Sequence, residues 1–320
     1  MTLRWQPLRA EDAVAWAALT AAAEIVDSTG ENYDADDLAE ELADPLVDLD
    51  HGTLAGWDGD VLAAVGLLRH SADPVPADRV HFDGVVHPAY RHRGWGRELT
   101  RWAVRTTPGL SARRYPGSPV EVHAGVHEKN TVKAALLEQE GFTAQRWFFS
   151  MQRPLDGQPP AVPALDGVRI EPFDLDRHDE AARQVRNEAF ADHWGSAQQT
   201  EASWKQWFTG TRTFVPQLSY VAVTDSGEVV AILLTHFFAA DEAVTGRREA
   251  WISTIGTVRA WRRRGLASAL IATGLAEAQR QGYDRAALGV DADSPTGALG
   301  VYQSAGFVVE SRHARYVRQF

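Results

Sequence analysis

One short motif occurs twice in this chain, at equivalent places in its two halves. It reads Arg91-His92-Arg93-Gly94-Trp95-Gly96 in the first half and Arg262-Arg263-Arg264-Gly265-Leu266-Ala267 in the second. Each copy follows an apolar run, opens a helical pattern and precedes a Gly-Phe pair, Gly141-Phe142 or Gly306-Phe307. Gly94 and Gly265 are 171 residues apart, and Gly141 and Gly306 are 165 apart, so the whole unit repeats. The sequence therefore predicts a duplicated fold with one phosphate-binding loop in each copy.

The domain organisation follows from this repeat and from one proline-rich segment. The length of 320 residues favours two domains. Pro154, Pro159, Pro160 and Pro163 form a stiff polar stretch between the halves. We expect an N-terminal domain at 1–153, a linker at 154–166 and a C-terminal domain at 167–320.

Both halves show one order of elements: strand, two helices, hairpin, strand, motif, helix, strand, helix, strand. The second half is expected to include a helix at Thr200–Phe208. The last strands of the two halves are expected at Ala144–Gln152 and Val308–Val317. This order predicts an α/β fold of two tandem domains, each with a curved, mixed, mostly antiparallel sheet flanked by helices.

Composition excludes several classes of site. The chain has no Cys, which rules out disulfides, thiolate metal sites and cysteine nucleophiles, and no metal is expected. A net charge of −11 argues against nucleic-acid binding. No apolar run approaches the roughly 18 residues of a membrane span, and the N-terminus lacks a signal-peptide pattern, so we expect a cytoplasmic protein without membrane contact.

Charge is unevenly distributed in the first half. No Lys or Arg stands between Arg9 and Arg69, whereas 11 acidic residues lie between Glu24 and Asp50. Solvated acidic helix faces explain this, and so does an acidic rim that attracts a cationic substrate or partner. Both interpretations stay open on the sequence alone.

The repeated motif has the chemistry of a pyrophosphate cradle. A loop that ends a strand and starts a helix presents unpaired backbone N–H groups and the positive end of the helix dipole. Glycines allow close approach of the backbone, and the arginines add charge. The spacing matches neither the nucleotide-hydrolase loop Gly-x-x-x-x-Gly-Lys-Ser/Thr nor the three-glycine dinucleotide fingerprint.

The pattern Arg/Gln-x-x-Gly-x-Gly/Ala, followed by an aromatic residue four positions before Gly-Phe, resembles the GNAT family of acyl-CoA N-acyltransferases. The resemblance covers both halves, in the tandem layout to which mycothiol synthase belongs. It implies acetyl-CoA (coenzyme A) as cofactor, held where the fourth and fifth strands part. The implied cofactor-binding residues are Ile255, Gly256, Thr257, Arg262, Arg263, Arg264, Gly265, Leu266 and Ala267 in the second half, and Val85, Val86, Arg91, His92, Arg93, Gly94, Trp95, Gly96 and Asn130 in the first.

The two halves differ at the residue that the family uses as acid. Four positions before Gly306 stands Tyr302, whereas four before Gly141 stands Leu137, which cannot donate a proton. We therefore expect catalysis in the C-terminal domain and a degenerate N-terminal domain. The second half also departs from the family: Arg259 replaces the usual Pro, and Asp293 with Pro295 replaces the loop Asn.

The predicted reaction is direct attack of a primary amine on the thioester, with Tyr302 protonating the departing thiolate. Glu249 is the candidate catalytic base. The predicted substrate-binding residues, which suit a small polar molecule, are Asn187, Phe190, His193, Trp194 and His236.

Two alternatives stay open: a non-enzymatic acyl-CoA sensor or scaffold, and an N-acetyltransferase acting on proteins or peptides. Mycothiol synthase activity fits the layout, but no substrate-specific residue selects it. We expect a monomer, because the tandem fold supplies two copies of the domain in one chain.

Overall fold

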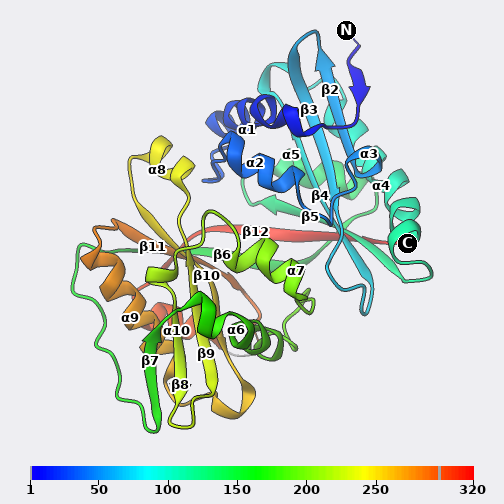
Figure 1. Cartoon of the computed structure of the whole chain (residues 1–320). Coiled ribbons are helices and arrows are strands. Elements are labelled where there is room, and N and C mark those ends of the chain that lie inside the picture. Colours follow the sequence, from blue (N-terminus) through cyan, green and yellow to red (C-terminus); the bar gives the residue numbers. More distant parts are fainter. Residues whose placement is uncertain (1, 295–296) are drawn as a thin grey trace. The chain divides into compact units, whose positions relative to one another are not determined.

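The computed structural model describes residues 2–294 and 297–320. Within them the chain forms two compact units (Figure 1). Of the described residues, unit 1 comprises 2–147 with 313–320, and unit 2 comprises 148–294 with 297–312. No helix within the described ranges is both long and apolar enough to cross a membrane.

Unit 1 is a sheet with helices on both faces. Its sheet runs in the order β1-β2-β3-β4-β5-β12, with β4 and β5 parallel and the other printed pairs antiparallel. Leu68, Val80 and Phe82 pack with α4 on one face, and Val65 and Leu67 pack with α1 on the other. The elements are β1 (Arg4–Gln6), α1 (Ala13–Asp27), α2 (Ala35–Leu42), α3 (Leu49–Gly52), β2 (Thr53–Asp58), β3 (Val61–Arg69), β4 (Asp78–Val86), α4 (Trp95–Arg114), β5 (Val120–His127), α5 (Thr131–Gln139) and β12 (Val308–Gln319), with 3-10 turns at Ala10–Asp12 and Pro88–Tyr90.

Unit 2 repeats this plan around one continuous core. Its sheet runs β6-β11-β10-β9-β8-β7, and β10 and β11 are its parallel pair. Buried residues of α6 and α9, including Val185 and Leu270, complete the core with the central strands. The elements are β6 (Thr143–Pro154), β7 (Val168–Pro172), α6 (Leu175–Ala189), α7 (Glu201–Trp204), a π-helical turn (Lys205–Thr209), β8 (Tyr220–Thr224), β9 (Val229–His236), α8 (Ala239–Thr245), β10 (Glu249–Thr257), α9 (Leu266–Arg280), β11 (Arg285–Asp291) and α10 (Ala298–Ser304), with 3-10 turns at Pro216–Leu218 and Arg259–Trp261.

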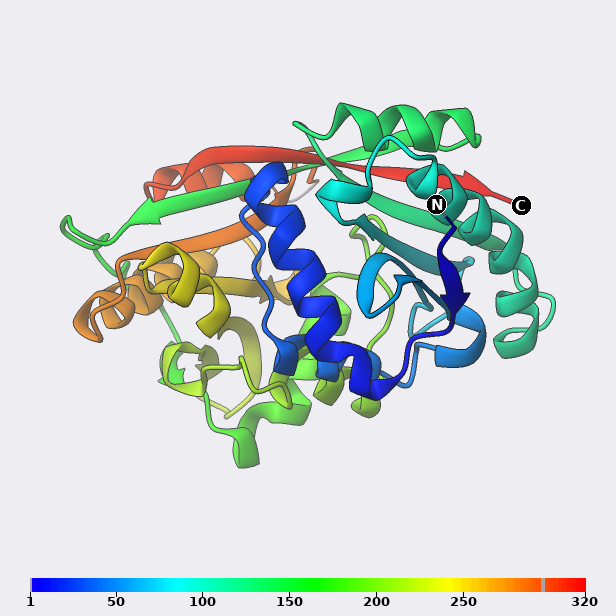
Figure 2. The ribbon, with the colours of Figure 1, turned by 90° about the horizontal axis from the view of Figure 1, so that it is seen from above.

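The last strand of each half completes the sheet of the other unit. Residues His313–Gln319 of β12, the red strand that ends at the C-terminus in Figure 2, pair with β5 in unit 1. Phe148–Pro154 of β6 pair with β11 in unit 2. The units therefore differ from the predicted boundaries at 153 and 167, because strand pairing is non-local and neither strand's own pattern encodes its partner.

Local predictions held best where a glycine fixes the backbone. The two motif helices begin at Trp95 and Leu266, directly after Gly94 and Gly265. The predicted helix Thr200–Phe208 is wrong in form, because α7 ends at Trp204 and a π-helical turn follows. The fold class, tandem α/β with mixed sheets, is confirmed.

Candidate active site

In each unit the two parallel strands part after a short paired segment. In unit 2, β10 and β11 pair from Glu249 with Arg285 to Ile252 with Leu288. Beyond that point β10 continues along β9, while β11 continues along β6. In unit 1, β4 and β5 part in the same way beyond His81 and His123. Each sheet therefore opens between its fourth and fifth strands, as the family resemblance implied.

The opening leaves backbone groups of β10 available to a ligand. The Val258 N–H donates to the Val230 carbonyl at 3.0 Å, so alternate residues from Val258 back, including Gly256, face β9. Ile255 and Thr257 face the opposite edge, where the described residues provide no pairing strand. Of the three predicted residues on β10, these two present the backbone that an extended pantetheine arm requires.

Unit 1 has the same arrangement on β4. His87 N–H donates to the Ala63 carbonyl at 2.9 Å, so the backbone of Val85 faces β3 and that of Val86 faces the gap. Of the two predicted residues, Val86 is therefore the one whose backbone lies at the open edge.

The two motif loops share one backbone conformation. In unit 2 the φ angles of Arg263 and Gly265 are 62° and 82°, and in unit 1 those of His92 and Gly94 are 61° and 88°. Alternating left-handed residues turn successive N–H groups toward one concave side, which binds anions. A Cβ added at Gly94 would meet no atom within 4 Å, and one at Gly265 would meet only Leu165 at 4.0 Å. The space above both loops therefore fits a pyrophosphate.

The arginines of the motif fall into two groups. Arg262 Nε donates to the Thr257 carbonyl at 3.3 Å, and its Nη2 donates to Ala189 at 3.0 Å. Arg91 Nε likewise donates to the Val86 carbonyl at 3.1 Å, and its guanidinium forms two bonds of 2.7 Å to Asp27. Both side chains anchor the loop to the strand before it.

The remaining basic residues of the motif lie at the surface. Arg264 stacks on Trp261 at 4.4 Å, and Arg93 stacks on Tyr90 at 5.4 Å. Arg263 and His92 are exposed. These are the side chains that can supply charge to a phosphate.

The first helical turn after each loop faces inward. Leu266 is buried and Ala267 is half-buried. Trp95 packs edge-on against Trp5 at 5.8 Å, and a Cβ added at Gly96 would lie 3.2 Å from Leu136. These residues place the helix ends, so any contact they make with a phosphate is through the backbone.

The predicted acceptor residues gather at the end of α6, next to β10. Phe190 packs over Gly256, where an added Cβ would lie 3.3 Å from its ring. Asn187 closes the following loop, because its Oδ1 accepts from Gln199 N–H at 2.8 Å and its Nδ2 donates to the Gln199 carbonyl at 3.0 Å. Asn187 therefore fixes the loop that follows α6, and both ends of its side-chain amide are used in doing so.

His193 in that loop is placed beside a buried carboxylate. Its Nδ1 lies 3.1 Å from the Trp194 carbonyl, which can only accept, so Nδ1 carries the proton. Nε2 then holds the basic lone pair and lies 3.9 Å from Asp291 Oδ2, at the end of β11. Sequence reasoning missed Asp291, which is 2% exposed, because nothing local distinguishes it from any acidic residue at a strand end.

Two further predicted residues have structural partners. Glu249 forms an ion pair of 2.5 Å with Arg285 Nε at the paired end of β10. About 20 Å of strand, at roughly 3.3 Å per residue, separates Glu249 from Ile255. His236 is buried and contacts Thr213 Oγ1 at 3.1 Å, and burial lowers the pKa of this imidazole to about 4. Burial raises the pKa of the Glu249 carboxyl in spite of its ion pair with Arg285, so it is the distance from Ile255 that argues against a contact of Glu249 with the amine. The lowered pKa makes His236 a weak proton acceptor.

Tyr302 lies on α10, and Leu137 lies at the equivalent place on α5. Tyr302 is 9% exposed and packs edge-on against Phe307 at 6.4 Å. Burial raises the pKa of its phenol to about 12, so the group keeps its proton at neutral pH. In unit 1, Asn130 caps α5 by accepting from Lys133 N–H at 3.0 Å. The corresponding Pro295 lies outside the described residues.

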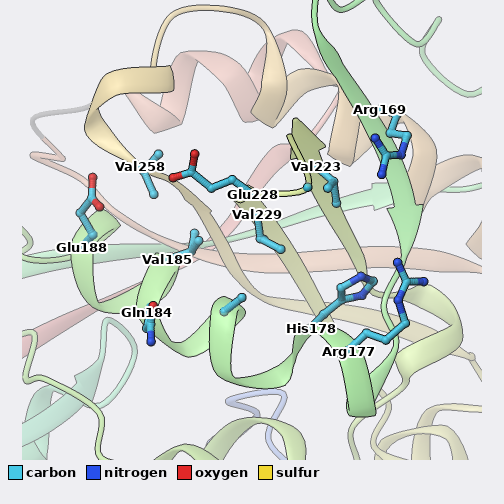
Figure 3. A pocket seen from close by; sticks show the side chains of 12 residues that line it. Arg169, Arg177, His178, Gln184, Val185, Glu188, Val223, Glu228, Val229 and Val258 are labelled. Atoms are coloured by element: carbon cyan, nitrogen blue, oxygen red, sulfur yellow. The ribbon is translucent and has the colours of Figure 1, made fainter. Parts of the chain in front are cut away.

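A separate hollow of about 550 Å³ lies beside α6 and is lined by residues of α6, β7, β8 and β9 (Figure 3). Val185, Val223, Val229 and Val258 provide its apolar lining, and Arg169 and Arg177 lie at one end. None of the predicted site residues lines it. It is distinct from the opening between β10 and β11.

A family model, "Acetyltransferase (GNAT) family", matches residues 180–307, which span the region from α6 to the end of α10. A mycothiol acetyltransferase of Salinispora arenicola is 31% identical over 283 residues, covering 87% of this chain and 84% of the relative. The chain belongs to the GNAT acetyltransferase family. A second mycothiol acetyltransferase, from Streptomyces avermitilis, is 31% identical and covers 81% of this chain and 77% of its own.

Solved structures agree over nearly the whole length. A GCN5-related N-acetyltransferase from Sphaerobacter thermophilus has a TM-score of 0.74 at 27% identity, covering 99% of this chain and 95% of its own. A tandem GNAT protein from the clavulanic acid biosynthesis pathway has a TM-score of 0.73 at 19% identity. The match covers 99% of this chain and 98% of that protein, and it shows the shared fold. The protein is therefore an acyltransferase of the GNAT type that uses acetyl-CoA.

Proposed function

We propose that unit 2 transfers the acetyl group of acetyl-CoA to a primary amine of a small polar molecule. The observation that carries this is the asymmetry between the units. Both have the open strand edge and the anion-binding loop, but only unit 2 has a buried tyrosine, Tyr302, where unit 1 has Leu137. Unit 1 then holds coenzyme A or serves the fold without turnover.

Separate parts of unit 2 bind acetyl-CoA and catalyse the transfer. The loop around Gly265 binds the pyrophosphate, and the backbone of Ile255 and Thr257 holds the pantetheine arm in the opening. An N–H of this edge also stabilises the oxyanion that forms when the amine attacks the thioester carbonyl. Tyr302, protonated because burial raises the pKa of its phenol to about 12, gives its proton to the departing sulfur.

His193 is the group that we assign to remove the amine proton, in place of Glu249. Its Nε2 lies 3.9 Å from the Asp291 carboxylate, whose negative charge would offset the positive charge that the imidazole gains with the proton. Glu249 is paired with Arg285 at the far end of β10, about 20 Å of strand from Ile255. Phe190 and Trp194 would hold the apolar part of the acceptor near β10.

The names of the relatives suggest the acceptor. Because proteins called mycothiol acetyltransferase align over most of this chain, we propose a mycothiol-related amine. The experiment is a thiol-release assay with acetyl-CoA and a panel of small polar primary amines that includes deacetylated mycothiol. Preferred turnover of that amine supports the acceptor, turnover of other amines alone refutes it, and no turnover of any amine refutes the enzymatic proposal in favour of a coenzyme A sensor.

A further inference from the structure

The hollow beside α6 has an apolar floor (Figure 3). Val223 of β8 pairs with Arg169 of β7 and with Val229 of β9, so these residues lie in one row across three strands, and all three line the hollow. On α6, Val185 and Ala181 line the same space, and Ala181 extends only a methyl group into it. The volume of about 550 Å³ lies within the range of small-molecule sites.

Two arginines at one end of the hollow share a single carboxylate. Arg169 Nε donates to Glu171 Oε1 at 2.6 Å, and Arg177 Nη2 donates to Glu171 Oε2 at 3.2 Å. Arg169 Nη1 also donates to the Thr224 carbonyl at 3.2 Å. Across the described ranges 2–294 and 297–320 the two guanidinium groups make no other hydrogen bond, although each has five N–H groups. Both therefore keep donors for a second anion.

The titratable groups beside these arginines leave that capacity in place. Asp174 and Asp176 lie at the positive end of the α6 dipole, and Asp174 Oδ1 caps the helix by accepting from Asp176 N–H at 3.0 Å. His178 Nδ1 accepts from Asp174 N–H at 3.0 Å, so Nε2 carries the ring proton. Burial is the main cause that lowers the pKa of this imidazole, which is therefore neutral near pH 7.

The part of the hollow away from the arginines is acidic. Glu188 of α6 and Glu228 of the β8–β9 turn line it there (Figure 3). Glu188 Oε1 accepts from the Arg259 N–H at 3.0 Å. Both carboxylates repel an anion, so an anionic group would bind at the arginine end and the rest of its ligand would extend over the valines. From β7 to the end of β10 this path crosses three strand spacings, about 14 Å.

We propose that this hollow binds a monocarboxylate with an unbranched apolar chain, its carboxylate on Arg169 and Arg177 and its chain along the valines. The planar guanidinium matches the two oxygens of a carboxylate, and two arginines that share one glutamate leave one positive charge for a monoanion. The site goes beyond the transfer proposed for unit 2 and does not depend on it.

Calorimetric titration of the full chain with butanoate, hexanoate and octanoate tests the proposal. Saturating coenzyme A is present throughout, so that neither motif loop nor the opening beside it serves as the binding site. Each added methylene should tighten binding roughly fourfold while the chain still lies within the hollow. Two analogues should bind at least tenfold more weakly than octanoate: octanamide, which lacks the charge, and octanedioate, whose second carboxylate would face Glu188 and Glu228.

Variants then locate the site. Ala181→Leu should abolish octanoate binding by filling the hollow, whereas Ala181→Ser should retain it. Arg177→Gln should weaken binding at least tenfold, and Arg280→Gln, which replaces an exposed arginine of α9 outside the hollow, should leave it unchanged. Melting curves check the fold of all four variants. If Ala181→Leu does not fold, Arg177→Gln decides, because this side chain is exposed.

Three results would overturn the proposal. They are binding of none of the three carboxylates, equal binding of octanamide and octanoate, and octanoate binding that survives Ala181→Leu or Arg177→Gln.

Discussion

Replacing each motif glycine with alanine separates the strain of the loop from its function. Gly94 and Gly265 have nearly the same left-handed conformation, with φ of 88° and 82°. Alanine costs about 1–2 kcal/mol in this conformation at either site. For a unit of this size, the melting temperature should fall by roughly 2–8 °C in both variants.

The two variants should differ in their kinetics. The new methyl group projects into the open space above the loop, because an added Cβ on Gly265 meets nothing nearer than Leu165 at 4.0 Å. It should displace a phosphate from backbone N–H groups, and the loss of one such charge-assisted bond, about 1.5–3 kcal/mol, raises the KM for acetyl-CoA roughly 10- to 150-fold. Gly94→Ala should leave that KM unchanged.

The assay is steady-state thiol release by both variants over a range of acetyl-CoA concentrations, with melting curves on the same samples. The equal stability loss makes each variant the control for the other. An equal rise in KM in both variants, or none in Gly265→Ala, would refute the assignment of the productive loop to unit 2.

Three further outcomes are expected. Because the pKa of Tyr302 is raised to about 12, the rate should rise with pH as the amine loses its proton and should show no falling limb near pH 10; a fall centred there would contradict the assigned acid. Arg264→Ala should raise the KM for acetyl-CoA at low salt and raise it less as ionic strength approaches about 0.15 M, because salt screens the exposed charge of Arg264. Arg262→Ala should raise this KM equally at low and high salt, because Arg262 anchors the loop. His193→Gln should lower kcat most at neutral pH, where the amine is still protonated and a neutral imidazole can take its proton, and least at alkaline pH, where the amine is already neutral. Glu249→Gln should lower the melting temperature by breaking the ion pair with Arg285 and should leave kcat unchanged; the reverse pattern would restore Glu249 as the base.

Features governed by local backbone rules were predictable from the sequence. Gly94 and Gly265 adopt the positive φ that a strand-to-helix loop requires, so the motif located both loops and both helix starts. The contrast of Tyr302 with Leu137 was likewise visible, because the family resemblance identifies the position four residues before Gly-Phe.

Features that depend on distant residues were not predictable. The exchange of β6 and β12 between the sheets rests on pairing over more than a hundred residues. The ion pair of Glu249 with Arg285, and the approach of His193 to Asp291, arise because separate strands and loops converge. Arg91 and Arg262 were expected on the phosphate, but their guanidinium groups point back to the preceding strands, which the motif does not reveal.

Tyr302→Phe isolates the role that we claim for Tyr302 of unit 2, protonation of the leaving thiolate. This variant keeps the ring that packs against Phe307 and removes only the hydroxyl. With kcat measured by thiol release and acetyl-CoA binding by calorimetry, we predict a fall in kcat of about 10²- to 10⁴-fold with unchanged affinity. An unchanged kcat would contradict the claim.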